Sequence, residues 1–556
     1  MRIAHPKTIR SGLLIWGLLS VAVQAVAAGK IPEADPANTV RIDSGLISGQ
    51  TGTGGNLRVF KGIPFAAPPV GPLRWKPPQP VQPWDGVRPC TEFGSWCPQP
   101  PPVIGKETGS QSEDCLYLNV WTPAKSPDDR LPVMVWIHGG GWTTGSGSQR
   151  GYRGDRLAEA GVVVVTINYR LGPFGFFAHP LLSAEADSKT SGNYGMLDQI
   201  EALRWVHRNI AAFGGNPDCV TVFGESAGAG SVARLLVVPQ AKGLFHRAII
   251  ESGGLAGFGR HLREPWYQAK PAEQVGEEIA AKLLPDKPVD ILDALRAKSA
   301  QDVLLAASPT VGLFREGSGV SFSPVVDGWL LPTDPELMVE RGQADDVPVI
   351  IGVNADEATV FTSKVPIRSE TDYRFLLEKV FGDRAAEALR LFPVCNGDCL
   401  AAFNDMTGVT GFVSEARHLA RELSRAGRSK VYLYYFSRVP LLPAATSLGA
   451  FHSSEIPYVF GTPETFTPIR GASAADRAVS QAMLSAWTCF ARTGNPNGEG
   501  LVNWPAYDSR TDAWLEFDDI IAVRYNLLKE GCDLGDSVRT VRQARDRKTF
   551  VQSQKQ

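Results

Sequence analysis

Residues 221–236 read TVFGESAGAGSVARLL, and in this stretch a serine lies between two glycines where an apolar run meets a helical pattern. The sequence G-x-S-x-G between a strand and a helix is typical of a sharp turn that holds the serine in a strained backbone conformation. Gly224 and Gly228 have no Cβ atom, which lets the strand and the helix approach each other closely. The stretch therefore predicts that Ser226 is held out at the top of a sheet.

The glycines of this turn allow two other interpretations. A strand-to-helix turn can contain a serine by chance, and such turns can also cradle phosphate groups. Gly139, Gly141 and Gly145 give G-x-G-x-x-x-G, one residue off the dinucleotide fingerprint, and no G-x-x-x-x-G-K-[ST] sequence is present. A nucleotide site is therefore disfavoured. Whether the serine occurs at this turn by chance has to be judged from the rest of the chain.

Short apolar runs begin near residues 131, 161, 219, 246, 347 and 430. They are nearly continuous rather than alternating, as strands buried on both faces must be. Residues 195–217 show helical spacing of apolar residues and end in Gly-Gly-Asn-Pro, which indicates an amphipathic helix between two strands. The predicted fold class is α/β, with a large, mostly parallel central sheet flanked by helices.

Composition is that of an ordinary globular protein, with 556 residues, 43% hydrophobic and 21% charged. No repeat, low-complexity block or long linker divides the chain, so we expect one domain over residues 29–540 and a charged tail over 541–556. A formal net charge of −2 gives no broad reason to attract nucleic acid or anionic membranes, and neither is expected as a partner.

The first 28 residues have the pattern of a cleaved secretory signal. A basic start is followed by an apolar run at 12–28 and by an A-x-A pattern at 25–27. The run is shorter than the roughly 20 residues of a spanning helix and contains Gln24, so no stable membrane anchor is expected. We therefore predict a signal peptide at 1–28 and a secreted or periplasmic protein.

Export would make the eight cysteines potential disulfide partners. Cys395 and Cys399 in CNGDC could close a small loop, whereas Cys219 and Cys489 lie in apolar runs and could be buried thiols. No C-x-x-C pair and no H-E-x-x-H sequence occurs, so no metal site is predicted.

A serine nucleophile at such a turn needs an acid and a histidine base, in the order Ser, acid, His. The histidines that follow the serine are His246, His261, His418 and His452. The first opens a strand, the second precedes any suitable acid, and the third lies in an amphipathic helical pattern. His452 follows the last predicted strand and is the best base, although a surface loop could also carry such a histidine.

The acid is expected in a strand-end loop, and VPVIIGVNADEATVF at 347–361 offers Asp356 and Glu357. Position alone does not choose between them, but Asp commonly caps a helix at such a junction. That role suits Asp356 and leaves Glu357 for catalysis.

An oxyanion hole completes this kind of site, formed by the N–H after the nucleophile and by an H-G-G-G-type loop after an earlier strand. WIHGGGW at 136–142 is such a loop. Three glycines alone more often form a flexible connector. Found together with the turn, the acid and the histidine in the required order, they favour a hydrolytic site.

The chain resembles the type B carboxylesterases, the cholinesterase-like branch of the α/β hydrolases. The matching stretches follow one another over nearly the whole chain after the leader: FKGIPFAAPPVGPLRW, SEDCLYLNVWTP, HGGGW, GNYGMLDQI, AFGGNP, VTVFGESAGAGS, GVNADEA, FHSSEIPYVFG and FARTGNPN. The resemblance implies the α/β-hydrolase fold, a small-molecule ester as substrate and no cofactor.

The resemblance also implies a role for individual residues. It makes Ser226 the nucleophile, Glu357 rather than Asp356 the acid, and His452 the base. It implies Gly140, Gly141 and Ala227 as oxyanion donors and a disulfide between Cys97 and Cys115, while Cys90 and Cys532 match no family partner. The expected reaction is two-step ester hydrolysis through an acyl-enzyme.

Uncharged aryl and alkyl esters are favoured over choline esters. In the cholinesterases that the chain resembles, an aromatic ring for the choline cation lies on the loop closed by this disulfide. Here that loop reads PQPPPVIGKETGSQSED and has no Trp, Tyr or Phe, although Trp142 could approach from elsewhere. Two other hypotheses are a non-catalytic adhesion or binding protein of the same fold and a peptidase that uses the triad.

Overall fold

The structure is a computed structural model that describes residues 38–540, with gaps at 53, 103–106, 256–259, 266–268, 287, 311–319, 363–364, 441–444 and 467–470. The predicted signal peptide at 1–28 and the charged tail at 541–556 lie outside the described residues.

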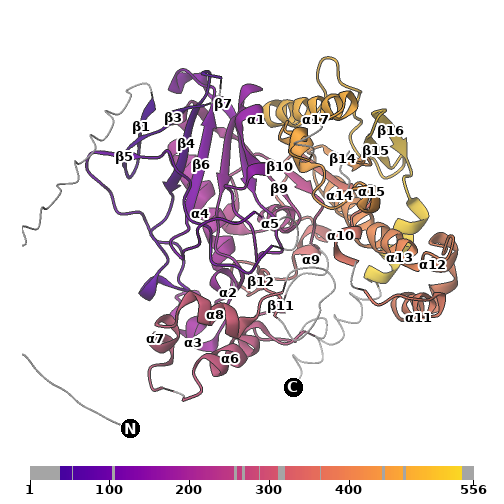
Figure 1. Cartoon of the computed structure of the whole chain (residues 1–556), viewed down its shortest axis with the longest axis horizontal. Coiled ribbons are helices and arrows are strands. Elements are labelled where there is room, and N and C mark those ends of the chain that lie inside the picture. Colours follow the sequence, from indigo (N-terminus) through magenta and orange to yellow (C-terminus); the bar gives the residue numbers. More distant parts are fainter. Residues whose placement is uncertain are drawn as a thin grey trace, which may run out of the picture.

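A central sheet of eleven strands organises the described chain (Figure 1). Its order is β16-β15-β14-β13-β10-β9-β7-β8-β6-β4-β3. In chain order the strands are β3 (Gln50–Thr51), β4 (Arg58–Pro64), β6 (Tyr117–Thr122), β7 (Leu131–Ile137), β8 (Val163–Ile167), β9 (Gly215–Glu225), β10 (Arg247–Glu251), β13 (Val349–Asn354), β14 (Val431–Phe436), β15 (Ala513–Phe517) and β16 (Ala522–Tyr525). In one smaller sheet, β2 (Gly45–Ser48) lies between β1 (Thr39–Ile42) and β5 (Val87–Pro89). In another, β11 (Arg260–His261) pairs with β12 (Val325–Val326).

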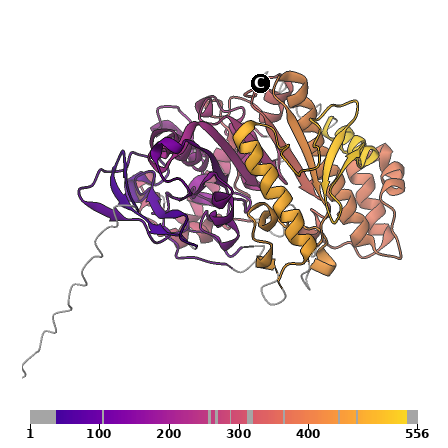
Figure 2. The ribbon, with the colours of Figure 1, turned by 90° about the horizontal axis from the view of Figure 1, so that it is seen from above.

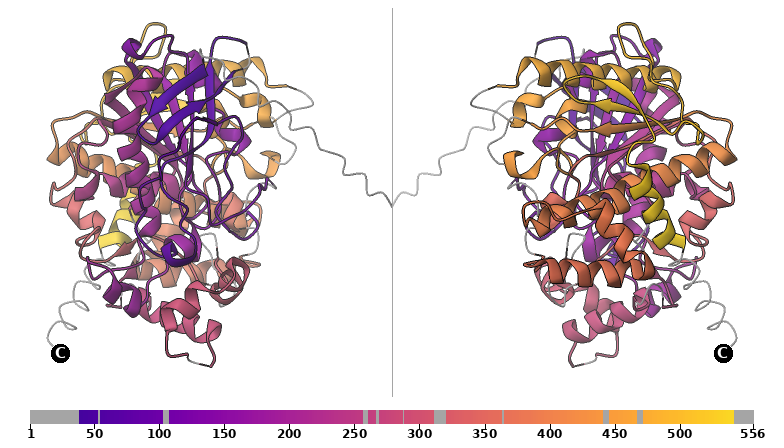
Figure 3. Two further views of the ribbon diagram at one scale, coloured as in Figure 1. Left: turned by 90° about the vertical axis from the view of Figure 1, so that its left-hand side faces the viewer. Right: turned by 90° about the vertical axis from the view of Figure 1, so that its right-hand side faces the viewer.

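The middle of the sheet is parallel, as the apolar runs predict. From β8 through β7, β9, β10, β13 and β14 to β15, every neighbouring pair is parallel. Within the described central sheet, antiparallel pairs occur only toward the edges, where β6, β4 and β3 lie on one side and β16 on the other. Figure 3 shows these edges from opposite sides, the early strands in one view and the late strands in the other. The mostly parallel sheet is confirmed.

Helices cover both faces of this sheet (Figure 2). They are α1 (Asp155–Glu159), α2 (Gly172–Gly175), α3 (Pro180–Glu185), α4 (Tyr194–Asn209), α5 (Ala227–Leu235), α6 (Ala272–Leu283), α7 (Ile291–Arg296), α8 (Ala300–Ala307), α9 (Pro335–Glu340), α10 (Thr359–Thr362), α11 (Glu370–Phe381), α12 (Ala385–Leu391), α13 (Cys399–Thr407), α14 (Ser414–Ala426), α15 (Ala445–Leu448), α16 (Ile456–Val459) and α17 (Ala474–Thr493). A final helical segment spans 529–540. The helix expected within 195–217 is α4, and it ends before Gly214, whose φ is +80°.

Strand β7 shows why helices are needed on both faces. Val133, Val135 and Ile137 pack in the core cluster that contains residues of α4 and α5. Met134 and Trp136 point the other way and join the cluster built around α17. Because side chains alternate between the two faces of a strand, a run that is apolar throughout is stable only between two helical layers.

Two features of the fold differ from the sequence-based expectation. Strands β15 and β16 follow His452, so the histidine lies beyond β14 and not beyond the last strand. Cys219 and Cys489 are half-buried rather than fully buried. In the described part of the chain, no helix has both the length and the apolar character needed to cross a membrane.

Candidate active site

Ser226 occupies the sharp turn between β9 and α5. Its φ is +56° and its ψ is −119°, a strained combination for a residue with a Cβ atom. Its N–H donates to the Glu251 carbonyl at 2.9 Å, and its carbonyl accepts the Gly230 N–H at 2.8 Å. The backbone of the neighbouring strand and of α5 therefore fixes the turn, and Ser226 itself is half-buried.

The acid and the histidine meet beside this turn. Glu357, which follows β13, lies with Oε2 2.5 Å from Nδ1 of His452, and both side chains are buried. The other oxygen of Glu357 accepts the backbone N–H of Asn354 at 2.7 Å. One carboxylate is thus held by the strand end while it orients the imidazole ring.

Asp356 has a different role from the helix cap that its position suggests. Its carboxylate accepts the backbone N–H of Ala450 at 2.7 Å. The backbone of Asp356 also pairs with Phe451, the residue before His452. Asp356 therefore anchors the loop that carries the histidine, whereas the adjacent carboxylate of Glu357 orients the imidazole ring.

The second ring nitrogen of His452 faces another carboxylate. Its Nε2 lies 3.0 Å from Oε1 of Glu225, the residue before the serine. Within the described residues, Nε2 makes no hydrogen bond to the Ser226 hydroxyl. Catalytic hydrogen bonds in free enzymes are often long and tighten only when substrate binds.

Glu225 belongs to a buried acidic cluster that sequence reasoning missed. We define this cluster as Glu225, Glu251 and Glu455, each at most 2% exposed. Glu225 accepts the Ser453 hydroxyl at 2.5 Å, and Glu251 accepts the Trp487 indole N–H at 2.7 Å. Burial raises the pKa of Glu225 to about 7 and that of Glu251 to about 8.

The cluster changes the basicity of the histidine. Burial lowers the pKa of His452, but the negative charges of Glu225 and Glu357 outweigh this effect and raise the pKa to about 9. The ordinary histidine pKa is about 6.5. The two carboxylates therefore stabilise the imidazolium form relative to a free histidine.

The H-G-G-G loop lies directly against the serine. A Cβ atom at Gly139 would lie 2.8 Å from the Glu225 carbonyl oxygen and 3.1 Å from Cβ of Ser226, so only glycine leaves room there. Gly140 and Gly141 have φ values of +99° and +62°, so the backbone turns here instead of continuing as an extended strand. The N–H groups of Gly140, Gly141 and Ala227 have no acceptor among the described residues. These are the donors that the resemblance implies for an oxyanion.

Two aromatic rings flank the histidine. The ring of Phe361 lies 4.9 Å and that of Phe412 5.5 Å from the imidazole, measured between centroids. Both are half-buried. Phe412 lies in a π-helical turn, Gly408–Val413, a rare geometry that often occurs at functional sites. The rings give the histidine an apolar neighbourhood.

Trp142 does not offer a free aromatic face. It is 2% exposed, and its indole N–H donates to Ser231 at 2.9 Å. The guanidinium of Arg234 lies 5.3 Å from the ring centroid and already makes a cation–π contact. The ring therefore packs beneath α5 rather than toward a ligand.

Cys97 and Cys115 are neighbours, as a disulfide would require. Both are buried, and they are free thiols in the structure. A hydrogen bond between them, together with burial, raises the pKa of Cys115 well above its ordinary value. Cys395 and Cys399 flank a tight turn at Asn396 and are likewise thiols. Each disulfide stays a prediction.

Comparison with known proteins identifies the family. The profile of the Carboxylesterase family matches residues 36–534. The chain belongs to the carboxylesterase family. Among its relatives, para-nitrobenzyl esterase of Bacillus subtilis (strain 168) is 39% identical over 495 residues, covering 86% of this chain and 94% of the relative. Fumonisin B1 esterase of Sphingopyxis macrogoltabida is 37% identical over 491 residues, covering 86% of each chain.

Solved structures agree with this assignment. A PNB esterase structure superposes with a TM-score of 0.75 at 36% identity, covering 90% of this chain and all of the other. A carboxylesterase structure from Geobacillus stearothermophilus gives a TM-score of 0.77 at 36% identity, covering 89% and 99%. This carboxylesterase therefore has the α/β-hydrolase fold and is a serine carboxylic-ester hydrolase, as expected from the sequence.

The acidic cluster leads to a prediction about pH. With His452 as the base that the resemblance implies, kcat/KM should rise with pH, because a base must lose its proton to act. Since the pKa of His452 is raised, the inflection should lie above the ordinary value of about 6.5. Glu225→Gln removes one of the supporting charges and should move this inflection down by about one pH unit.

The matched control is Glu499→Gln, which removes an exposed carboxylate and should leave the inflection in place. The measurement is the pH profile of kcat/KM for a slowly hydrolysed ester, so that diffusion does not limit the rate. An unchanged inflection in Glu225→Gln would show that Glu225 does not set the basicity of His452.

Proposed function

We propose that Ser226, Glu357 and His452 are the catalytic triad of this esterase. The observation that carries the proposal is the contact between Glu357 and Nδ1 of His452 at 2.5 Å, beside a serine held in a strained turn. Gly140, Gly141 and Ala227 supply the N–H groups of the oxyanion hole.

The reaction then follows two steps. His452 takes the proton of the Ser226 hydroxyl as the oxygen attacks the ester carbonyl, and the oxyanion forms against the three N–H groups. The C–O bond breaks, and the alcohol leaves with the proton from His452. In the second step, His452 takes a proton from water, the hydroxide attacks the acyl-enzyme, and the carboxylic acid leaves as Ser226 regains its proton.

Uncharged aryl and alkyl esters are the proposed substrates. Phe361 and Phe412 give the histidine an apolar surrounding that suits such groups. The relatives named above act on para-nitrobenzyl and fumonisin B1 esters by their names, and a further relative, cocaine esterase of Homo sapiens, is 36% identical over 548 residues. Comparing an ester with its matching amide separates this proposal from a peptidase.

The triad assignment predicts the effect of removing each member. Ser226→Ala and His452→Ala should each lower kcat by roughly 10⁴- to 10⁶-fold, because the triad acts as a unit. Both variants should remain folded, which thermal unfolding monitored by circular dichroism checks.

His207→Ala is the matched control, since His207 is exposed near the end of α4, and it should keep kcat within about threefold. A folded Ser226→Ala variant with normal turnover would exclude Ser226 as the nucleophile. Such a result would also favour the hypothesis of a binding protein whose hydrolysis comes from a contaminant.

A second prediction concerns charged alcohols. The loop between Cys97 and Cys115 has no aromatic residue, and Trp142 already faces Arg234. We expect kcat/KM for a choline ester to be no higher than for the isostere with a tert-butyl group in place of trimethylammonium. A preference for choline of tenfold or more, about 1.4 kcal/mol, would require a cation site.

We also propose that the protein is exported and that Cys97 and Cys115 form a disulfide there. The leader-like sequence and the closeness of the two buried thiols support this proposal. After expression with its own leader, the mature chain should begin near residue 29, and an unreduced digest should contain the linked peptides. Recovery of the intact leader would contradict the proposed export. Alkylation of both cysteines without prior reduction would contradict the proposed disulfide.

A further inference from the structure

The loop after β10 forms a wall beside the nucleophile. We call residues 252–255 the buttress loop. A Cβ atom at Gly253 would overlap the carbonyl oxygen of Ser226 and lie 2.8 Å from Cβ of Ala229. The loop thus packs on the peptide of the serine and on the first turn of α5, which presents the Ala227 N–H.

Two charged side chains hold the buttress loop from behind. Arg234 of α5 donates to the Gly254 carbonyl at 3.2 Å and to that of Leu255 at 3.5 Å. Glu415 of α14 accepts the Leu255 N–H at 2.8 Å. A Cβ atom at Gly254 would lie 2.5 Å from the same Glu415 oxygen, so the carboxylate is in close contact with the loop.

Glu415 is itself paired with the last described helix. Its second oxygen accepts from Arg539 at 2.8 Å, and the two side chains are 8% and 11% exposed. The segment 529–540 is fixed to α14 by further contacts, in which Asp533 binds Arg417 and Asp536 binds Arg421. Arg539 lies beyond residue 534, where the match to the family profile ends.

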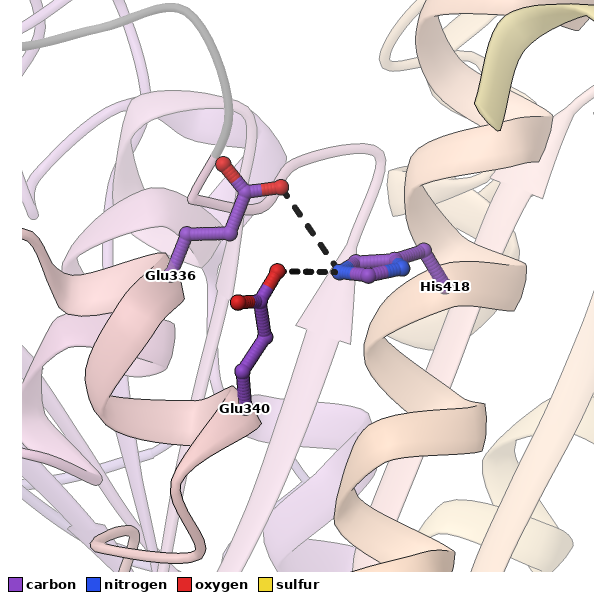
Figure 4. A group of neighbouring side chains, drawn as sticks. All are labelled: Glu336, Glu340 and His418. Carbon is purple, nitrogen blue, oxygen red and sulfur yellow. Dashed lines mark ion pairs between the residues drawn. The ribbon is translucent and has the colours of Figure 1, made fainter. Parts of the chain in front are cut away.

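Glu336, a second partner of Arg539, belongs to the group that Figure 4 shows with Glu340 and His418. Nε2 of His418 lies 3.6 Å from Glu336 and 3.9 Å from Glu340, and Arg539 Nε lies 3.0 Å from the same Glu336 oxygen. Arg421 donates to Nδ1 of His418 at 2.8 Å, so Nε2 carries the ring hydrogen and faces the carboxylates. Glu336 therefore faces both His418 and Arg539, and the imidazole does not present a lone pair to a metal ion.

We propose that Glu415 is a positioning residue for ester hydrolysis, which acts through the Leu255 N–H and is held by Arg539. This inference rests on Ser226 being the nucleophile. The hydrogen bond from Leu255 keeps the buttress loop against the Ser226 peptide and against the helix turn that bears an oxyanion donor. Because a small displacement of reacting groups costs a large factor in rate, loosening this loop should act on kcat.

The test compares two substitutions at one position. Glu415→Ala removes the acceptor for Leu255, and we expect kcat to fall at least tenfold while KM changes by less than about threefold. Glu415→Gln keeps an acceptor oxygen and should recover most of the kcat. Rapid-quench or stopped-flow measurement of the acylation burst should show the same order for the acylation step.

Arg438→Gln is the control for a purely structural effect. It breaks the buried pair of Arg438 with Asp476 of α17, and neither residue has a contact with Glu415, Arg539 or the buttress loop among the described residues. It should lower the melting temperature and leave kcat unchanged. If Glu415→Ala is as active as the wild type, or if Glu415→Gln is as slow as Glu415→Ala, the proposed role is wrong.

Two further variants keep the test decisive. Should Glu415→Ala fail to fold, Arg539→Gln removes the partner instead and should lower kcat, whereas the double variant with Glu415→Gln should recover part of it. Recovery should follow because no lone carboxylate is left buried. No loss of kcat in Arg539→Gln overturns the proposal. Ser226→Ala is measured with the same ester to distinguish failure of the triad proposal from failure of the role of Glu415. An active Ser226→Ala variant would show that the triad assignment is wrong, whatever the Glu415 variants do.

Discussion

The close approach of two glycines to one carbonyl group is the constraint on which the site depends. Strands β7 and β9 are parallel neighbours, and Ile137 pairs with Gly224. A Cβ atom at Gly224 would lie 2.5 Å from the Ile137 carbonyl oxygen, and one at Gly228 would overlap it. Since the H-G-G-G loop begins at the next residue, His138, this single approach brings that loop, Ser226 and the start of α5 together.

The order of strands then determines where the other partners can lie. Strands β10 and β13 follow β9 in the sheet, and their carboxyl ends bring Glu251 and Glu357 to the same edge as Ser226. His452 reaches this edge from the loop after β14, the next strand. Residues that lie far apart along the chain thus meet because parallel strands end on one side.

Much of this arrangement could be predicted from the sequence. Continuous apolar runs gave the parallel strands, and the order of serine, acid and histidine left few candidates for each role. The acidic cluster could not be predicted, because Glu225 and Glu251 end apolar strands and Glu455 follows a loop, with no shared spacing. Likewise, Asp356 has the position of a helix cap, and only the path of the 450–452 backbone gives it another partner.

The ion pairs around Glu415 can be traced to one buried N–H group that needs a hydrogen-bond acceptor. Leu255 is 4% exposed, and its N–H needs an acceptor, which Glu415 provides. An ionised carboxylate is costly to bury unless it is paired, and Arg539 compensates the charge of Glu415. The guanidinium of Arg539 forms further ion pairs with Glu336 and Asp536.

The outer members of this series of ion pairs lie closer to the surface than Glu415. Asp536 is 20% exposed and Asp533, one turn earlier, is 43% exposed, so the series ends where water can solvate the last charges. An apolar contact could press on the buttress loop, but it could not accept the Leu255 N–H. The hydrogen bond from Leu255 places the charge of Glu415 in a buried position. Arg539 balances this charge, and Asp536 in turn balances Arg539 close to solvent. The ionic network therefore extends from the buttress loop to the surface.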